Sequence, residues 1–217
     1  MKKIMFNDKY GLTQAVLDGR KTMTRRIIPC PKTYKGNPVR GFRITGSKDI
    51  RLSVEICVYD ESCDDFVPMY IQPKYEVGEV VAIAQSYESV YHEYGLETMD
   101  MLVSSLKYNA GWTNKMFVKA EYMPNHIKII NVKVERLQDI SNEDYLKEGI
   151  VKQEVISDKS PFLYAYDAFL NGDNKYFASR WFRNPREPFS ILIDKVSGKG
   201  TWEENPFVWV YEFALWD

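Results

Sequence analysis

Eight consecutive residues of this 217-residue chain gather four cations and two hydroxyl groups in one short stretch, Gly19-Arg20-Lys21-Thr22-Met23-Thr24-Arg25-Arg26. A threonine hydroxyl attacks an amide carbonyl when a neighbouring base removes its proton. A lysine can act as that base if burial or adjacent cations lower its pKa. The cations of the same stretch also form a candidate basic patch for recognition of nucleic acid. The basic octet, residues 19–26, is therefore the candidate for chemistry or recognition.

The residues before the octet predict a helix that ends at Gly19. Leu12, Ala15, Val16 and Leu17 recur at helical spacing after the Asn7-Asp8 pair, which is a suitable N-terminal cap. Unpaired carbonyl groups at a helix C-terminus attract cations. A purely structural role for the first cations of the octet is therefore the alternative to a functional one.

A strand is predicted to follow, from Thr22 to Ile28, with Pro29 ending it. In an ideal strand, residues three positions apart point to opposite faces, which would separate Lys21 from Thr24. The two side chains can share a site if Lys21 lies in a turn before the strand begins.

Composition limits the classes of protein to which the chain can belong. It is 45% hydrophobic and 27% charged, and no apolar run reaches the length of about 20 residues that a membrane span requires. The N-terminus has positive charge but lacks the apolar middle of a signal peptide, which predicts a cytoplasmic protein. A net charge of -1 argues against bulk electrostatic coating of nucleic acid and leaves a local basic patch open.

Metal and cofactor sites are not predicted. The three cysteines form no Cys-x-x-Cys pair, and two histidines add few further ligands. The scarcity of histidine also weakens any Ser-His or Cys-His arrangement for nucleophilic catalysis.

The order of elements predicts an α+β fold, with a small, mostly antiparallel β-barrel and short helices between the strands. Strands are expected at residues 80–84, 116–120, 127–137 and 207–215, and two or three more within 31–75. Short helices are expected after Ser141, ending at Gly149, and between Asn184 and Gly198. The chain is expected to be a single domain, residues 1–217, with insertions near 31–75, 88–114 and 152–183.

Taken together, these motifs resemble the ASCH family of the PUA-like superfamily, in particular its longer bacterial and phage members. The resemblance rests on the spacing Gly19-x-Lys21-x-x-Thr24-x-Arg26, the run after Gly78, the short helix ending at Gly149 and the Trp-Val-Tyr-Glu-Phe strand at 209–213. It implies a β-barrel with a cleft that binds RNA or a modified nucleoside.

Some small bacterial members of this family are amidohydrolases that remove the acyl group of N4-acetylcytidine with a lysine, a threonine and a glutamate. By position in the motifs, the resemblance assigns these roles to Lys21, Thr24 and Glu148. The family's usual Gly-Asp is Gly78-Glu79 here, so Glu79 offers a longer carboxylate at the same place.

Further charged residues are candidates for ligand binding. Beyond the three of the catalytic assignment, the predicted ligand-binding residues are Arg20, Arg25, Arg26, Glu79, Lys119 and Arg180. Arg180 stands next to Trp181 and Phe182, a mixture that suits single-stranded nucleic acid or a solvated loop equally. Lys21, Thr24 and Glu148 also have plain interpretations, as a helix-end charge, a strand residue and a solvated helix residue.

Three functional hypotheses follow. The first is a binding module whose basic cleft receives RNA or a modified nucleoside. The second is an amidohydrolase with Thr24 as nucleophile and Lys21 as base. The third is a phage-associated interaction protein that retains the barrel. The enzyme hypothesis requires a closed pocket of nucleoside size, whereas the binding hypothesis requires an open basic groove with exposed rings.

Overall fold

The computed structural model describes residues 1–29, 31–39, 42–45, 54–94, 105–155, 163–168 and 181–216. Within these ranges, no helix has the length and apolar character needed to cross a membrane.

The protein is α+β, and its centre is a five-stranded mixed sheet with the order β1-β8-β9-β12-β2. Its strands are β1 (Lys3–Ile4), β8 (Val80–Ile83), β9 (His126–Arg136), β12 (Phe207–Trp216) and β2 (Met23–Ile27). β1 and β8 are parallel, and the other neighbours are antiparallel. The pairings of the described strands leave β1 and β2 at the two edges, so they do not close the sheet into the predicted barrel.

The first half of strand β12 is buried on both faces, from Val208 to Tyr211. Trp209, Tyr211 and Phe213 of β12 belong to one hydrophobic cluster, with Ile4, Val16, Ile83 and Ile127 among its other members. Val208 and Val210 point to the opposite face and pack in a second cluster. Side chains alternate between the faces of a strand, so a run apolar at every position needs cover on both sides.

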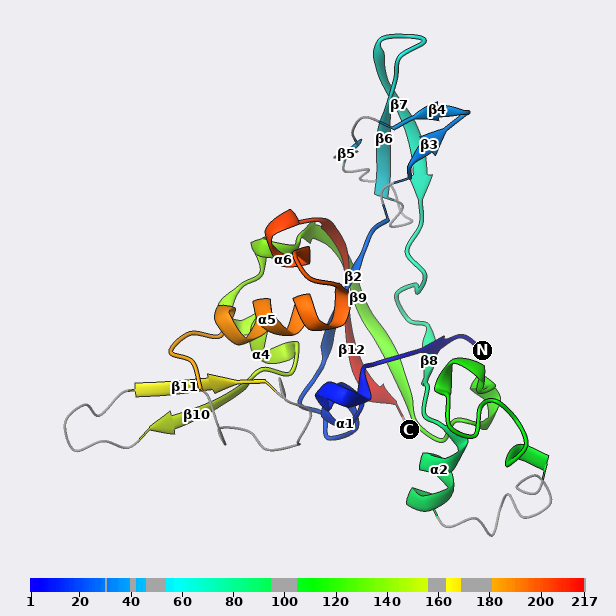
Figure 1. Cartoon of the computed structure of the whole chain (residues 1–217), viewed down its shortest axis with the longest axis vertical. Helices are drawn as coiled ribbons and strands as arrows, with labels where there is room; N and C mark the ends of the chain where they lie inside the picture. The colour runs from blue at the N-terminus through cyan, green and yellow to red at the C-terminus, as the bar shows by residue number, and fades with distance from the viewer. Residues whose placement is uncertain are drawn as a thin grey trace.

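Helices supply that cover. Figure 1 shows three of them gathered on one side of β2 and β12, namely α4 (Asn142–Lys147), α5 (Arg186–Ser197) and α6 (Thr201–Glu204). The second cluster includes Tyr145 of α4, Phe189 of α5 and Trp202 of α6, with the Phe189 and Trp202 rings 6.0 Å apart. On the other face, Val16 of α1 (Leu12–Leu17) joins the first cluster.

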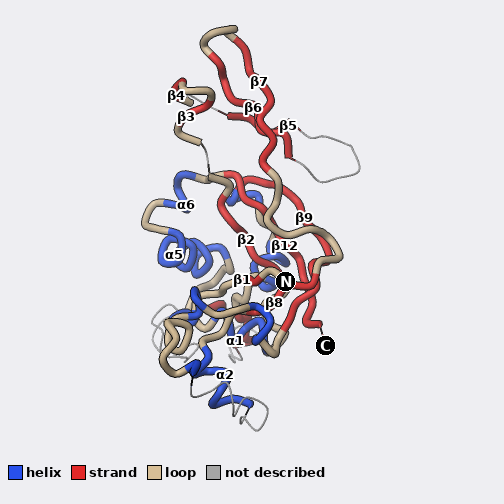
Figure 2. The backbone as a smooth tube through the Cα atoms, turned by 90° about the vertical axis from the view of Figure 1, so that its right-hand side faces the viewer, coloured by secondary structure: helices blue, strands red, loops and turns tan. Residues whose placement is uncertain are grey.

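Two small sheets form an arm that extends beyond one end of the main sheet (Figures 1 and 2). One sheet pairs β3 (Thr33–Tyr34) with β4 (Asn37–Pro38), and the other orders β5 (Phe42–Thr45), β6 (Val54–Asp60) and β7 (Asp65–Ile71). The described part of the region predicted to hold two or three strands contains five, because residues 33–38 form a short hairpin of their own.

Further elements lie in the other two predicted insertions, next to them, or directly after β9. A helix, α2 (Tyr87–Tyr94), follows β8, and a two-stranded hairpin joins β10 (Val151–Val155) to β11 (Leu163–Asp167). A short 3₁₀ helix, Leu137–Asp139, follows β9.

Two local predictions are wrong. The strand expected at residues 116–120 is replaced by the 3₁₀ turns Lys115–Phe117 and Ala120–Tyr122. The Lys3 ammonium donates to the carbonyl oxygens of Met116 and Val118, at 2.7 and 2.5 Å, so a side chain from β1 satisfies both carbonyls where a neighbouring strand would otherwise do so.

The expected Asn7-Asp8 cap is also wrong, because a 3₁₀ turn, Asp8–Tyr10, precedes α1 and Gly11 occupies the cap position. The Asp8 carboxylate instead accepts hydrogen bonds from the Thr13 hydroxyl and the Lys115 ammonium.

The two faces of β9 near its start predict contrasting mutational effects. Ile129 is 1% exposed in the sheet core, whereas its neighbour Ile130 is 54% exposed. Ile129→Ala should lower the free energy of unfolding by about 2–5 kcal/mol, because it removes buried methyl groups and leaves a cavity. Ile130→Ala, the matched control, should change it by less than about 0.5 kcal/mol. Urea denaturation measures both values, and similar losses in the two variants would contradict this assignment of faces.

Candidate functional site

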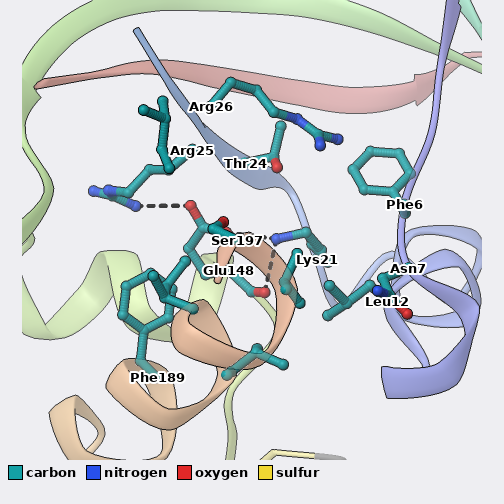
Figure 3. Close-up of a pocket in the computed structure, with 14 residues that line it drawn as sticks. Phe6, Asn7, Leu12, Lys21, Thr24, Arg25, Arg26, Glu148, Phe189 and Ser197 are labelled. Carbon is teal, nitrogen blue, oxygen red and sulfur yellow. Dashed lines mark hydrogen bonds and ion pairs between the residues drawn. The ribbon is translucent and has the colours of Figure 1, made fainter. Parts of the chain in front are cut away.

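A pocket of about 330 Å³ opens at the edge strand β2, between α1, α4 and α5 (Figure 3). Its volume lies in the range of about 300–1,000 Å³ that is common for small-molecule sites. Charged, polar and apolar groups converge in it. The residues that line it are Phe6, Asn7, Leu12, Lys21, Thr24, Arg25, Arg26, Ile27, Glu148, Phe189, Leu192, Ile193, Val196 and Ser197.

The turn between α1 and β2 sets the position of Lys21. Gly19 has a φ of 71°, a left-handed conformation that glycine adopts without strain, and the Lys21 amide then donates to the Ala15 carbonyl at 2.7 Å. β2 begins only at Met23. Lys21 therefore lies in the turn before the strand, which is the arrangement that lets it share a site with Thr24.

Glu148 reaches the pocket from the end of α4. The Ser141 hydroxyl accepts a hydrogen bond from the Asp144 amide at 3.1 Å, so the predicted cap of this helix is confirmed. Gly149 follows with a φ of 98°, and a β-carbon there would lie 3.5 Å from Cβ of Lys21. Close packing at this turn places the Glu148 side chain against the lysine.

Lys21 and Glu148 form a buried ion pair. Nζ of Lys21 lies 2.5 Å from Oε2 of Glu148 and donates a second hydrogen bond to the Glu148 main-chain carbonyl at 2.8 Å. The two residues are 3% and 4% exposed. The fold therefore brings Lys21 and Glu148, the two most separated residues of the catalytic assignment, into direct contact across 127 positions of the sequence.

Arg25 forms an ion pair with the second oxygen of the Glu148 carboxylate. Its Nη1 donates to Oε1 of Glu148 at 2.9 Å, and its Nη2 lies 2.5 Å from Glu135 and 3.3 Å from Asp144. Lys133 completes this network through Glu135 and Asp144. Both Glu148 oxygens thus accept from cations, which fixes the carboxylate in one orientation.

Opposing effects set the pKa of Lys21. Burial lowers it, because the ammonium loses its hydration, while the Glu148 charge and hydrogen bond raise it; Arg26 and Arg25 lower it further. The net direction is downward. For Arg25, burial alone would lower the pKa, but Glu148 and Glu135 raise it overall, so this guanidinium stays charged.

The Thr24 hydroxyl faces the pocket. Among the described residues this hydroxyl has no hydrogen-bond partner. Every fully buried side-chain oxygen or nitrogen in the described chain has such a partner, so the Thr24 oxygen is accessible to solvent, through the pocket that Thr24 lines. In Figure 3 this hydroxyl points toward the Lys21 ammonium. An alcohol without a partner beside a buried amine is an arrangement that can support nucleophilic attack.

Arg26 lines the same pocket from β2 on the other side of Thr24. Its Nη2 donates to the Met5 carbonyl at 2.5 Å, and its guanidinium lies 5.7 Å from the centre of the Phe6 ring. Burial lowers the pKa of Arg26, partly offset by Tyr75, Glu148 and Tyr211.

Three of the predicted ligand-binding residues lie outside this pocket. Arg20 pairs with Asp18 at 2.8 Å, and Glu79 accepts from Lys2 and from the Glu76 amide, both at 3.0 Å. Lys119 lies over the Tyr122 ring, 5.6 Å from its centre. Arg180 lies outside the described residues.

Sequence reasoning missed the apolar wall of the pocket and the carboxylates behind it. The helical stripe of α5 was visible as Phe189, Leu192 and Val196, and the Asn184 side chain does accept from the Glu187 amide at its start, at 3.1 Å. Nothing in its spacing indicated contact with β2. The sequence pattern did not indicate a role for Glu135 in the site, because charged residues that alternate along a strand are common on solvated faces.

Comparison of the chain with family models, curated proteins and solved structures found no match.

The buried network predicts a large penalty for removing its shared carboxylate. Glu148→Gln should lower the free energy of unfolding by about 3 kcal/mol or more, because Lys21 and Arg25 are then left buried with one charge fewer to offset them. Glu212→Gln is the control, since Glu212 pairs with Lys147 at 2.8 Å but both side chains are partly exposed. That change should cost less than about 1 kcal/mol. Equal losses in thermal or urea unfolding would mean that the Glu148 pairs contribute no more than a surface pair.

Proposed function

We propose that the pocket binds an N4-acylated cytidine and that the protein hydrolyses its acyl amide. The observation that carries the proposal is the Thr24 hydroxyl, without a partner in the described chain, next to the buried Lys21 whose pKa is lowered. A pocket of about 330 Å³ with both apolar walls and polar groups favours a single small ligand over an extended strand of RNA.

The proposed reaction proceeds in two steps. Neutral Lys21 takes the proton of the Thr24 hydroxyl as its oxygen attacks the acyl carbonyl carbon. The bond from that carbon to N4 of the base then breaks, N4 receives the proton from Lys21, and cytidine leaves. Water next attacks the threonyl ester, releasing the carboxylic acid and restoring the hydroxyl. No redox partner is needed.

Glu148 acts in this proposal as a positioning residue. Its two oxygens accept from Lys21 and Arg25, so it fixes the direction of the lysine and has no oxygen left over to protonate a leaving amine. This differs from the expected role of proton donor, which Lys21 takes over. Asn7 and Ser197, which also line the pocket, offer an amide and a hydroxyl for orienting the polar edge of the base.

The proposal also includes a PUA-like fold for the main sheet. The pairings of the described strands leave the main sheet open, but its mostly antiparallel order, the octet at its edge strand β2 and the strand β12 beside it favour a PUA-like arrangement.

Binding without hydrolysis is the second candidate. The direct Lys21–Glu148 pair favours it, because a carboxylate 2.5 Å away stabilises the ammonium form of lysine, which cannot accept a proton. The same pocket would then recognise a modified nucleoside, free or within RNA, without changing it.

An assay of N4-acetylcytidine hydrolysis separates the two candidates. The parent protein should release cytidine, and Thr24→Val, which keeps the shape but removes the hydroxyl, should lose activity by about 100-fold or more. Lys21→Met should lose a similar factor, whereas Thr24→Ser should retain activity. Thr22→Val is the matched control, because Thr22 lies two residues away and does not line the pocket. Lack of turnover by the parent, in the presence of measurable binding, would leave the binding candidate.

The pH dependence of the reaction follows from the shifted lysine. Activity requires neutral Lys21, so kcat/KM should rise with pH through the pKa of this group, with an inflection below the usual value of about 10.4. Glu148 raises that pKa in the parent. Glu148→Gln, measured under conditions where it is folded, should therefore move the inflection to lower pH. A rate that falls as pH increases from neutral, or an inflection that moves to higher pH in the variant, would contradict Lys21 as the base.

A further inference from the structure

The pocket contains a cation that the surrounding carboxylates do not neutralise. Lys21, Arg25 and Lys133 form salt bridges with Glu148, Glu135 and Asp144, so this part of the network holds three cations and three carboxylates. Arg26 lines the same pocket, and among the described residues no carboxylate forms a salt bridge with it.

The groups nearest to Arg26 do not supply the missing negative charge. Tyr75 and Tyr211 act on it electrostatically, but burial raises the pKa of Tyr75 to about 12 and also raises that of Tyr211, so both are uncharged near neutral pH. Glu148 acts on it as well, but that carboxylate is already shared by Lys21 and Arg25.

Arg26 also has unused hydrogen-bonding capacity. A guanidinium carries five N–H donors, and in the described chain Arg26 donates through Nη2 to the Met5 carbonyl. The Phe6 ring, 5.7 Å from the guanidinium, limits its movement on one side. A partly buried guanidinium held at one end, with remaining donors beside a pocket, matches the planar geometry with which arginine binds an oxyanion.

We infer that the ligand of this pocket carries a phosphate group that Arg26 binds, so that a nucleotide is preferred over a free nucleoside. This inference rests on the proposed nucleoside ligand and specifies its class. The 5′-monophosphate and the 3′-monophosphate share the same chemistry, and they represent a free nucleotide and a fragment of an RNA chain respectively.

Titration calorimetry of the whole protein tests the inference without relying on turnover. The probes are cytidine, its 5′-monophosphate, its 3′-monophosphate and inorganic phosphate. One of the monophosphates should bind at least about tenfold more tightly than cytidine, because a charge-assisted hydrogen bond is worth that factor or more. Its affinity should fall as salt is added.

Two arginine variants from the same octet locate the effect. Arg26→Gln should reduce the preference for the monophosphate over cytidine to less than about threefold. Arg20→Gln is the matched control, because Arg20 pairs with Asp18 and does not line the pocket, and it should keep the full preference. Thermal unfolding of both variants shows whether they remain folded. Arg26→Lys, which keeps the charge, should recover part of the preference and covers the case in which the glutamine variant does not fold.

The outcomes separate this inference from the proposed hydrolysis. Equal affinities for cytidine and both monophosphates, or a preference retained in Arg26→Gln, would overturn the phosphate site even if N4-acetylcytidine is hydrolysed. Phosphate or monophosphate binding that depends on Arg26, with no hydrolysis, would support the phosphate site and refute the enzymatic proposal. Binding of inorganic phosphate that depends on Arg26, with no binding of cytidine in any form, would support the anion site and refute the nucleoside ligand.

Discussion

The contact between Lys21 and Glu148 is the interaction on which the pocket depends. It joins the turn after α1 to the end of α4, with both side chains almost fully buried. A buried charge is strongly unfavourable without a partner, so each residue restricts where the other can lie. The carbonyl of Glu148 accepts a second hydrogen bond from the same ammonium, which ties the main chain at the end of α4 to the turn before β2.

Arg25 extends this constraint from a pair to a network. Because it bonds to Glu148, Glu135 and Asp144, one guanidinium links α4 and β9 to the edge strand β2. A group fixed in this way loses little further freedom when a ligand binds, which is what a preorganised site requires. The same network distinguishes two adjacent arginines: Arg25 bonds to carboxylates within the protein, whereas Arg26 has donors that no group of the described chain accepts.

Local patterns predicted much of the fold. The helix that ends before Gly19, the capped helix after Ser141, the long strand 126–136 and the closing strand 207–216 all follow from short-range spacing and turn chemistry. The failures at residues 115–122 and at the Asn7-Asp8 cap have one cause. There, lysine side chains from distant positions bind the main chain or the capping carboxylate, and such contacts override local preference.

By itself, the sequence determined which groups are available at the octet, where α1 ends, and where α4 and α5 begin and end, because these depend on residues a few positions apart. The resemblance added Glu148 as a partner, and its contact with Lys21 required the tertiary structure. So did the apolar wall from α5 and the neutralisation of Arg25 but not Arg26. These properties depend on which distant segments share a buried volume, and desolvation in that volume decides which charges must be paired.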